Sequence, residues 1–273
     1  VVHLNLGFTH LGLLASRLAR RHSIPYVLTP HGVYGRHNMA ARSLAKRLFL
    51  ALFERRVIRG AAFIQALVKP EADAIRSIGG TEEQVQIIPN GVSLSAFDQR
   101  HPTTPLSELC GFSPDRPFLL SLSRIHSSKG LDLLIPAFAE ATRERADWQL
   151  VIAGPDDGYL AEARQLAEQA GVANGVHFPG PLFGDAKQQA FADARAFALT
   201  SYAEGMPLAV LEAGAAGLPV LISDRCNLPD IETAGGSYKA EKLMFETSSN
   251  GVDVTESSGP RTITYTHDNG KGG

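Results

Sequence analysis

Two glutamates, Glu204 and Glu212, lie on either side of a turn and a predicted helix start. The apolar run at 196–199 predicts a buried strand, and a turn containing Gly205 and Pro207 follows it. Proline is favoured at the start of a helix, and the free N–H groups there can bind an anion. Carboxylates can accept hydrogen bonds from hydroxyl groups. The stretch could therefore bind a phosphate together with the hydroxyl groups of a sugar.

A second group of charges lies in residues 123–130, which read SRIHSSKG and contain Arg124 and Lys129. This segment follows a predicted strand and precedes a predicted helix, and ligands of α/β sheets bind just outside the carboxyl ends of strands. A guanidinium and an ammonium placed there can hold a diphosphate. The alternative is a solvated basic turn with no ligand.

Both stretches resemble one protein family. Residues 204–222 read EGMPLAVLEAGAAGLPVLI and resemble the E-x7-E motif of the retaining glycosyltransferases of family 4, the group 1 glycosyl transferases. Residues 123–130 resemble the S/G-R-x-x-x-x-K-G segment of the same family. The resemblance covers about residues 1–235.

The resemblance implies a role for each of these residues. Arg124 and Lys129 would bind the pyrophosphate of the donor and act in catalysis. Glu212 would bond to the ribose hydroxyl groups, and Glu204 would face the donor sugar as a catalytic residue. The backbone facing the sugar and the phosphates would be that of Gly205, Met206, Pro207 and Leu208.

Three further residues have weaker signals. The turn at 178–184 would lie near the nucleotide base, with Leu182 and Lys187 beside it, although glycine and proline explain this turn without any ligand. His31 ends a predicted strand in Thr-Pro-His-Gly. By resemblance it would face the donor sugar across the cleft and act in catalysis, whereas a single histidine can equally be structural.

The implied reaction transfers a glycosyl group from a nucleotide-diphosphate sugar to a sugar, glycan or lipid-linked acceptor, with retention of configuration. The cations and the helix start would stabilise the leaving diphosphate, so neither a metal nor another cofactor is expected. The sequence has no D-x-D motif. Two alternatives stay open, an inactive nucleotide-binding remnant and a nucleotide-sugar epimerase. Only the transferase would need an acceptor.

Strand-like and helix-like segments alternate along residues 1–99 and 117–236, which predicts α/β domains with parallel sheets. The polar, proline-rich segment 100–116 reads as a linker. The resemblance implies the GT-B architecture, two doubly wound Rossmann-like domains facing each other across a cleft. The first would be the acceptor side and the second the nucleotide-sugar side. We expect both to be incomplete and the chain to have little transferase activity, since the family's glycine-rich loop is missing. The polar tail 237–273, with one alternating run at 262–266, does not resemble the family and is expected to be disordered.

Composition limits the classes of partner. The chain has 273 residues, of which 44% are hydrophobic and 20% charged, which is typical of a soluble protein with room for two cores. Its net charge of -2 gives no bulk attraction to nucleic acid. The two cysteines, Cys110 and Cys226, fit no disulfide or metal framework, which favours a cytoplasmic location. No apolar stretch reaches membrane-spanning length.

A helix expected over residues 39–59 carries six basic side chains between 42 and 59, together with large apolar ones. Such a helix could lie on an anionic membrane surface and hold the protein at the inner face of the membrane. We favour a core-facing helix with a charged outer face, because the chain as a whole is not basic.

Overall fold

The computed structural model divides into two compact units. The residues that it describes are 1–5, 7–34, 49–94, 97, 104–143, 147–226, 228, 247–248 and 251–252. The first unit comprises Val1–Asn90 with Ala203–Met206, and the second comprises Gly91–Tyr202 with Pro207–Gly273. Each unit is built on its own parallel sheet, so each is described separately.

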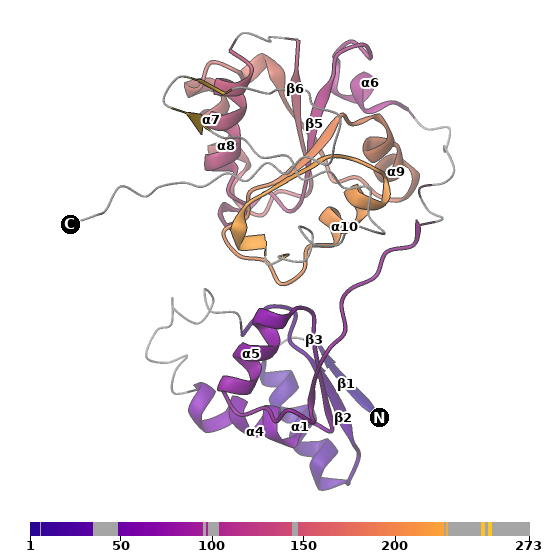
Figure 1. Ribbon diagram of the computed structural model, residues 1–273, viewed down its shortest axis with the longest axis vertical. Helices are drawn as coiled ribbons and strands as arrows, with labels where there is room; N and C mark the ends of the chain where they lie inside the picture. Colours follow the sequence, from indigo (N-terminus) through magenta and orange to yellow (C-terminus); the bar gives the residue numbers. More distant parts are fainter. Residues whose placement is uncertain are drawn as a thin grey trace, which may run out of the picture. The chain divides into compact units, whose positions relative to one another are not determined.

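The first unit has a four-stranded parallel sheet in the order β1-β2-β3-β4 (Figure 1). The strands are β1 (Val2–Asn5), β2 (Tyr26–Thr29), β3 (Phe63–Ala66) and β4 (Val85–Ile87). The helices are α1 (His10–Arg21), the π-helix η1 (Leu50–Glu54), α4 (Arg55–Gly60) and α5 (Lys69–Ser77). The strand order does not reverse within the described part of this unit. Right-handed crossovers then place successive helices on one face of the sheet, as α1, α4 and α5 lie in Figure 1.

The second unit has a five-stranded parallel sheet in the order β7-β6-β5-β8-β9. Its strands are β5 (Phe118–Leu122), β6 (Gln149–Ala153), β7 (Val176–Gly180), β8 (Ala196–Leu199) and β9 (Val220–Ile222). Its main helices are α6 (Leu106–Cys110), α7 (Leu131–Ala141), α8 (Leu160–Gln169), α9 (Gly184–Asp193) and α10 (Leu208–Ala215). The chain first builds the sheet outward on one side of β5 and then returns to the other side with β8. The strand order therefore reverses between β5 and β8, which makes that position the topological switch point.

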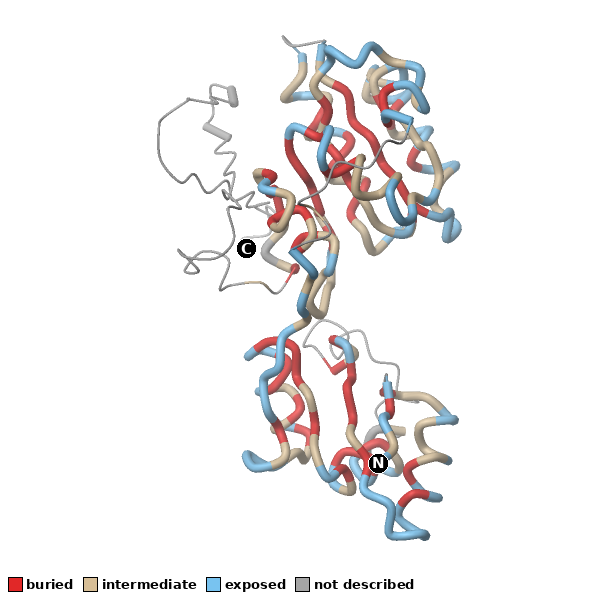
Figure 2. The backbone as a smooth tube through the Cα atoms, turned by 90° about the vertical axis from the view of Figure 1, so that its right-hand side faces the viewer, coloured by how far each residue is buried: buried red, intermediate tan, exposed pale blue. Residues whose placement is uncertain are grey.

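Two apolar cores cover the two faces of this second sheet. One contains residues of α9 and α10, such as Phe191 and Val210, and the other contains residues of α7 and α8, such as Leu134 and Ala163. All five residues of β6 are buried, as expected for a central strand covered on both faces (Figure 2). The predicted doubly wound fold is confirmed here.

Helix α6 corrects part of the predicted linker. Within the predicted linker 100–116, Leu106 at the start of α6 is only 2% exposed and packs in the same core as Phe118. The prolines and polar residues around α6 give the segment the composition of a linker, although it contains a short helix whose leucine packs in the core. The second unit thus begins before residue 117.

Other sequence predictions fall partly outside the described residues. Of the helix expected over 39–59, the described part contains η1 and α4, in which Val57 and Ile58 are buried and Arg55, Arg56 and Arg59 are exposed. This is the arrangement of a core-facing helix. The run at 262–266 lies outside the described residues. In the described part of the chain, no helix combines the length and apolarity needed to cross a membrane.

Candidate functional site

The switch point of the second unit is built by two loops that are joined to each other. The first follows β5 and the second follows β8. The Tyr202 N–H donates to the Ser128 carbonyl at 2.9 Å, and the Thr200 hydroxyl donates to the Gly130 carbonyl at 2.8 Å. Gly130 has a φ of 65°, and a Cβ built on it would overlap the Thr200 carbonyl oxygen. Only glycine therefore allows the two loops to approach this closely.

The loop after β5 carries Arg124 and Lys129 at the carboxyl end of that strand. Ile125, which is 1% exposed, anchors the loop in the core. The His126 imidazole accepts the Ser128 N–H at 3.1 Å and caps a short 3-10 turn, η3 (Ser127–Lys129). The Arg124 side chain is 60% exposed and forms an ion pair with Asp157 from the loop after β6. Both residues thus lie at the carboxyl edge of the sheet, the edge at which open α/β sheets generally bind ligands.

The loop between β8 and α10 contains Glu204, Gly205, Met206 and Pro207, all half-buried. Pro207 is the N-cap of α10, with a φ of -71°, so the helix begins one residue later, at Leu208. Proline has no N–H, so Pro207 itself can donate no hydrogen bond to a phosphate. Residues Ala203–Met206 group with the first unit. The role of Glu204 beside the two cations therefore stays a prediction.

Two predicted ligands of the nucleotide are brought together across 25 residues of sequence. The Lys187 ammonium on α9 donates to the Glu212 carboxylate on α10 at 2.6 Å, and the two side chains are 28% and 19% exposed. Sequence reasoning assigned Lys187 to the base and Glu212 to the ribose without expecting this pair. Leu182 packs beside the core near the start of α9, whereas Leu208 is 49% exposed.

His31 lies in the first unit, at the carboxyl end of β2. It is exposed, has a φ of 54°, and its Nε2 lies 3.2 Å from the Asn5 amide oxygen. The turn that holds it depends on a residue that sequence reasoning missed. Glu71, which is 3% exposed, accepts the N–H groups of Gly32 at 2.5 Å and Leu67 at 2.8 Å. A charged residue in the first turn of α5 gives no sign of this buried role in the sequence.

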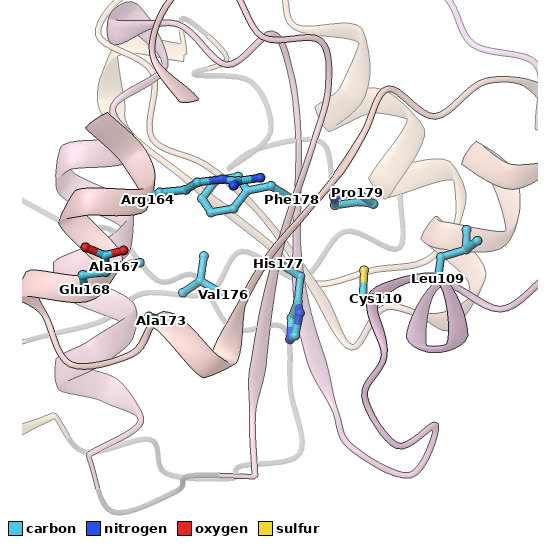
Figure 3. Close-up of a pocket in the computed structure, with 10 residues that line it drawn as sticks. All are labelled: Leu109, Cys110, Arg164, Ala167, Glu168, Ala173, Val176, His177, Phe178 and Pro179. Atoms are coloured by element: carbon cyan, nitrogen blue, oxygen red, sulfur yellow. The ribbon is translucent and has the colours of Figure 1, made fainter. Parts of the chain in front are cut away.

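A separate pocket of about 380 Å³ lies beside the edge strand β7 (Figure 3). It is lined by residues of α6, α8, η4 (Ala173–Gly175) and β7, which are Leu109, Cys110, Arg164, Ala167, Glu168, Ala173, Val176, His177, Phe178 and Pro179. None of the residues predicted to bind the donor lines it. The pocket is therefore distinct from the switch-point site. Burial raises the pKa of the Cys110 thiol in this pocket to about 11, so this thiol stays protonated near neutral pH.

His177 in this pocket should make stability depend on pH. Its Nε2 lies 2.8 Å from the Gln149 amide oxygen, and burial lowers its pKa below the usual 6.5. The unfolded chain then takes up the proton more readily, so stability is retained above pH 6.5 and lost as the pH falls below it. We expect the melting temperature of the wild type to drop more than that of His177→Gln between pH 7.5 and 5.5. Equal pH slopes for the two proteins would refute this assignment.

Side chains that could bind a metal ion were compared across the described ranges. Among those residues, no group of three or more histidine, cysteine, aspartate or glutamate side chains is arranged to hold a metal ion.

These features define a class of protein, an α/β protein with two parallel sheets and a cationic site at the switch point of the second. Among solved structures, that of Anabaena Alr3699/HepE in complex with UDP and glucose is similar, with a TM-score of 0.68 and 20% identity over 84% of this chain and 61% of that one. The fold is the GT-B architecture.

The family follows from the sequence matches. The family model described as "Glycosyl transferases group 1" matches residues 110–249, and the one described as "Glycosyl transferase 4-like domain" matches residues 1–91. The chain belongs to the group 1 glycosyl transferases. The first match extends beyond residue 236, the predicted end of the second domain.

Two relatives illustrate the range of named activities. A D-inositol 3-phosphate glycosyltransferase of Nocardia farcinica is 27% identical over 75% of this chain and 47% of its own length. An alpha-monoglucosyldiacylglycerol synthase of Streptococcus pneumoniae is 26% identical over 81% of this chain and 51% of its own length. The chain thus spans about half the length of these relatives.

Proposed function

We propose that the chain binds a nucleotide-diphosphate sugar and transfers its glycosyl group to an acceptor with retention of anomeric configuration. The proposal rests mainly on one observation. Arg124 and Lys129 lie in a loop at the switch point of the second sheet, joined by hydrogen bonds to the loop that leads into α10. Ligands of open α/β sheets bind at this position. Membership of the group 1 glycosyl transferases supports the class of reaction.

The proposed mechanism relies on fixed positive charge. The bond between the anomeric carbon and the diphosphate oxygen breaks, and negative charge grows on the diphosphate. An acceptor hydroxyl oxygen forms the new bond to the anomeric carbon, and its proton leaves with the diphosphate. Arg124 and Lys129 stabilise that charge, together with the free N–H groups at the start of α10. The Glu212 carboxylate accepts hydrogen bonds from the ribose hydroxyl groups. Because the protein itself supplies the cations, we propose that transfer is metal-independent.

The names of similar proteins suggest which compounds to test first. HepE is in complex with UDP and glucose, and the names of the two relatives above point to an inositol phosphate in one and to the synthesis of a glucosyl lipid in the other. We therefore propose a UDP-sugar as the first donor to test and a sugar or lipid-linked acceptor.

A thermal-shift titration with UDP, GDP, ADP and their glucose conjugates tests the donor site. A ligand at 100 times its dissociation constant adds about 2.7 kcal/mol to the folded state, which is a measurable shift. We expect one nucleotide series to raise the melting temperature and Arg124→Ala and Lys129→Ala to lose that shift. A cooperative melt that no nucleotide moves would rule out the proposed donor site.

Incubation of the identified nucleotide sugar with and without candidate acceptors then tests the reaction. Release of the nucleoside diphosphate that depends on an acceptor is the expected result for a transferase. Release of free nucleotide with an altered sugar and no acceptor would indicate an epimerase. Binding without any turnover would indicate a nucleotide-binding remnant.

A further inference from the structure

The loop after β6 is fixed beside Arg124 by backbone contacts. The Ile125 N–H donates to the Pro155 carbonyl at 2.9 Å, and the Asp157 N–H donates back to the Ile125 carbonyl at 3.0 Å. A Cβ built on Gly154 would overlap the Ser123 carbonyl oxygen, so the backbones of the two loops are in direct contact. The backbone thus holds Asp157 next to Arg124 whatever their side chains do.

The two adjacent carboxylates of this loop have different tasks. Asp156 accepts the N–H groups of Gly158, Tyr159 and Leu160 at 2.9, 3.2 and 3.2 Å, so it holds the turn that leads into α8. The Asp157 carboxylate instead pairs with the Arg124 guanidinium. The two paired side chains are 45% and 60% exposed, and such an exposed ion pair adds little to stability. The contribution of the Arg124–Asp157 pair to folding stability is therefore small, and we consider its effect on ligand binding.

Asp157 faces the same cation that the proposed function assigns to the donor diphosphate. A guanidinium presents a limited set of N–H groups, and carboxylate and phosphate oxygens both bind them in the same planar geometry. A diphosphate arriving at Arg124 must displace Asp157 or lie beside its negative charge. Both outcomes weaken binding.

The weakening should be greater for the product than for the donor. A nucleotide sugar carries two negative charges on its diphosphate. In the nucleoside diphosphate released after transfer, the second phosphate is no longer bonded to the sugar and has a second pKa of about 6, so the product carries about one charge more at neutral pH. A fixed carboxylate repels the more highly charged species more strongly.

We propose that Asp157 is a built-in competitor for Arg124 that sets nucleotide affinity and favours release of the nucleoside diphosphate product. This inference rests on the proposed function, because it requires Arg124 to bind the diphosphate. Asp157 acts through Arg124, so it is a positioning residue and not a catalytic one.

Calorimetric titration of the whole chain with UDP, GDP and ADP, and with the matching glucose conjugates, tests the proposal. For the nucleotide that binds, Asp157→Asn should tighten nucleoside diphosphate binding by about 3- to 10-fold at low salt, and by less for the sugar conjugate. The gain should shrink as salt is raised. Because the amide keeps the size of the side chain, the melting temperature should change little. Asp157→Ser provides a second variant if the asparagine protein folds poorly.

Two controls separate competition for Arg124 from a general charge effect. Asp193→Asn removes an exposed carboxylate of α9 that bonds to Gln189 at 2.7 Å, and it should leave affinity unchanged. In an Arg124→Ala background, where only the direct repulsion by Asp157 remains, Asp157→Asn should give a clearly smaller gain than in the wild type. A gain of the same size without Arg124, or an equal gain from Asp193→Asn, would overturn the proposal.

The possible failures are distinguishable. If the wild type binds none of the nucleotides, the proposed function fails. If it binds one and Arg124→Ala weakens that binding, while Asp157→Asn leaves it unchanged or weaker, the donor site stands and the role of Asp157 is refuted.

Discussion

Glu212→Ala is expected to lower the affinity of the chain for its nucleotide by about 10- to 100-fold. Hydrogen bonds to a charged group are worth about 1.5–3 kcal/mol, and the proposed ribose contacts would lose a carboxylate acceptor. The fold should survive the change. The Lys187 side chain that loses its partner is 28% exposed, so water can hydrate the ammonium. We therefore expect a stability loss of about 1 kcal/mol or less.

Comparison of Glu212→Ala with Glu212→Gln separates the effect of losing the charge from the effect of losing the hydrogen-bond acceptor. The amide keeps an oxygen that can accept a ribose hydroxyl but loses the charge, so it should retain part of the affinity. Calorimetric titration and a thermal melt of each variant provide the two readings. An alanine variant that binds the nucleotide as tightly as the wild type would remove Glu212 from the donor site.

Gly130→Ala is expected to lower the free energy of unfolding by about 3 kcal/mol or more. The new Cβ would have to occupy a backbone conformation with φ of 65°, which costs about 1 kcal/mol or more by itself. It would also overlap the Thr200 carbonyl oxygen, and backbone atoms cannot turn aside as a side chain can. The two loops would have to separate, losing the bonds between Gly130 and Thr200 and between Ser128 and Tyr202.

Gly111→Ala is the matched control for this steric effect. Gly111 follows α6 with a φ of 74°, and nothing lies within 4 Å of a Cβ built on it. This variant should suffer the backbone strain alone, about 1 kcal/mol. Urea unfolding of both proteins measures the difference. Similar losses in the two variants would show that the close approach of the loops contributes nothing.

The fold was predictable because each strand and helix carries its signal locally. The apolar run at 196–199 and the alternation of strand and helix along 117–236 predicted the second sheet, which is confirmed. Helix α6 was missed because one buried leucine in a proline-rich segment gives no periodic pattern. Glu71 was missed because its partners, the N–H groups of Gly32 and Leu67, are not identifiable from its neighbours in sequence.

The candidate site was predictable as a set of residues but not as a set of pairs. Arg124 and Lys129 were identified by their place between a strand and a helix. The pairing of Arg124 with Asp157, 33 residues away, depends on β5 and β6 being neighbours in the sheet. The pairing of Lys187 with Glu212 likewise depends on the packing of α9 and α10 against one core. Such contacts follow from strand order, which the alternation of elements does not specify.

The way in which the site loops are joined has a consequence for how such a protein can diverge. Ser128 and Tyr202, and Ile125 and Asp157, are tied by main-chain N–H and carbonyl groups that nearly every amino acid possesses. Exchanging the exposed side chains on these loops would alter which ligand is preferred and leave the spacing of the loops intact. The backbone hydrogen bonds thus set the spacing of the loops, whereas the exposed side chains set the ligand preference. A single substitution of an exposed side chain could therefore change specificity without unfolding the protein.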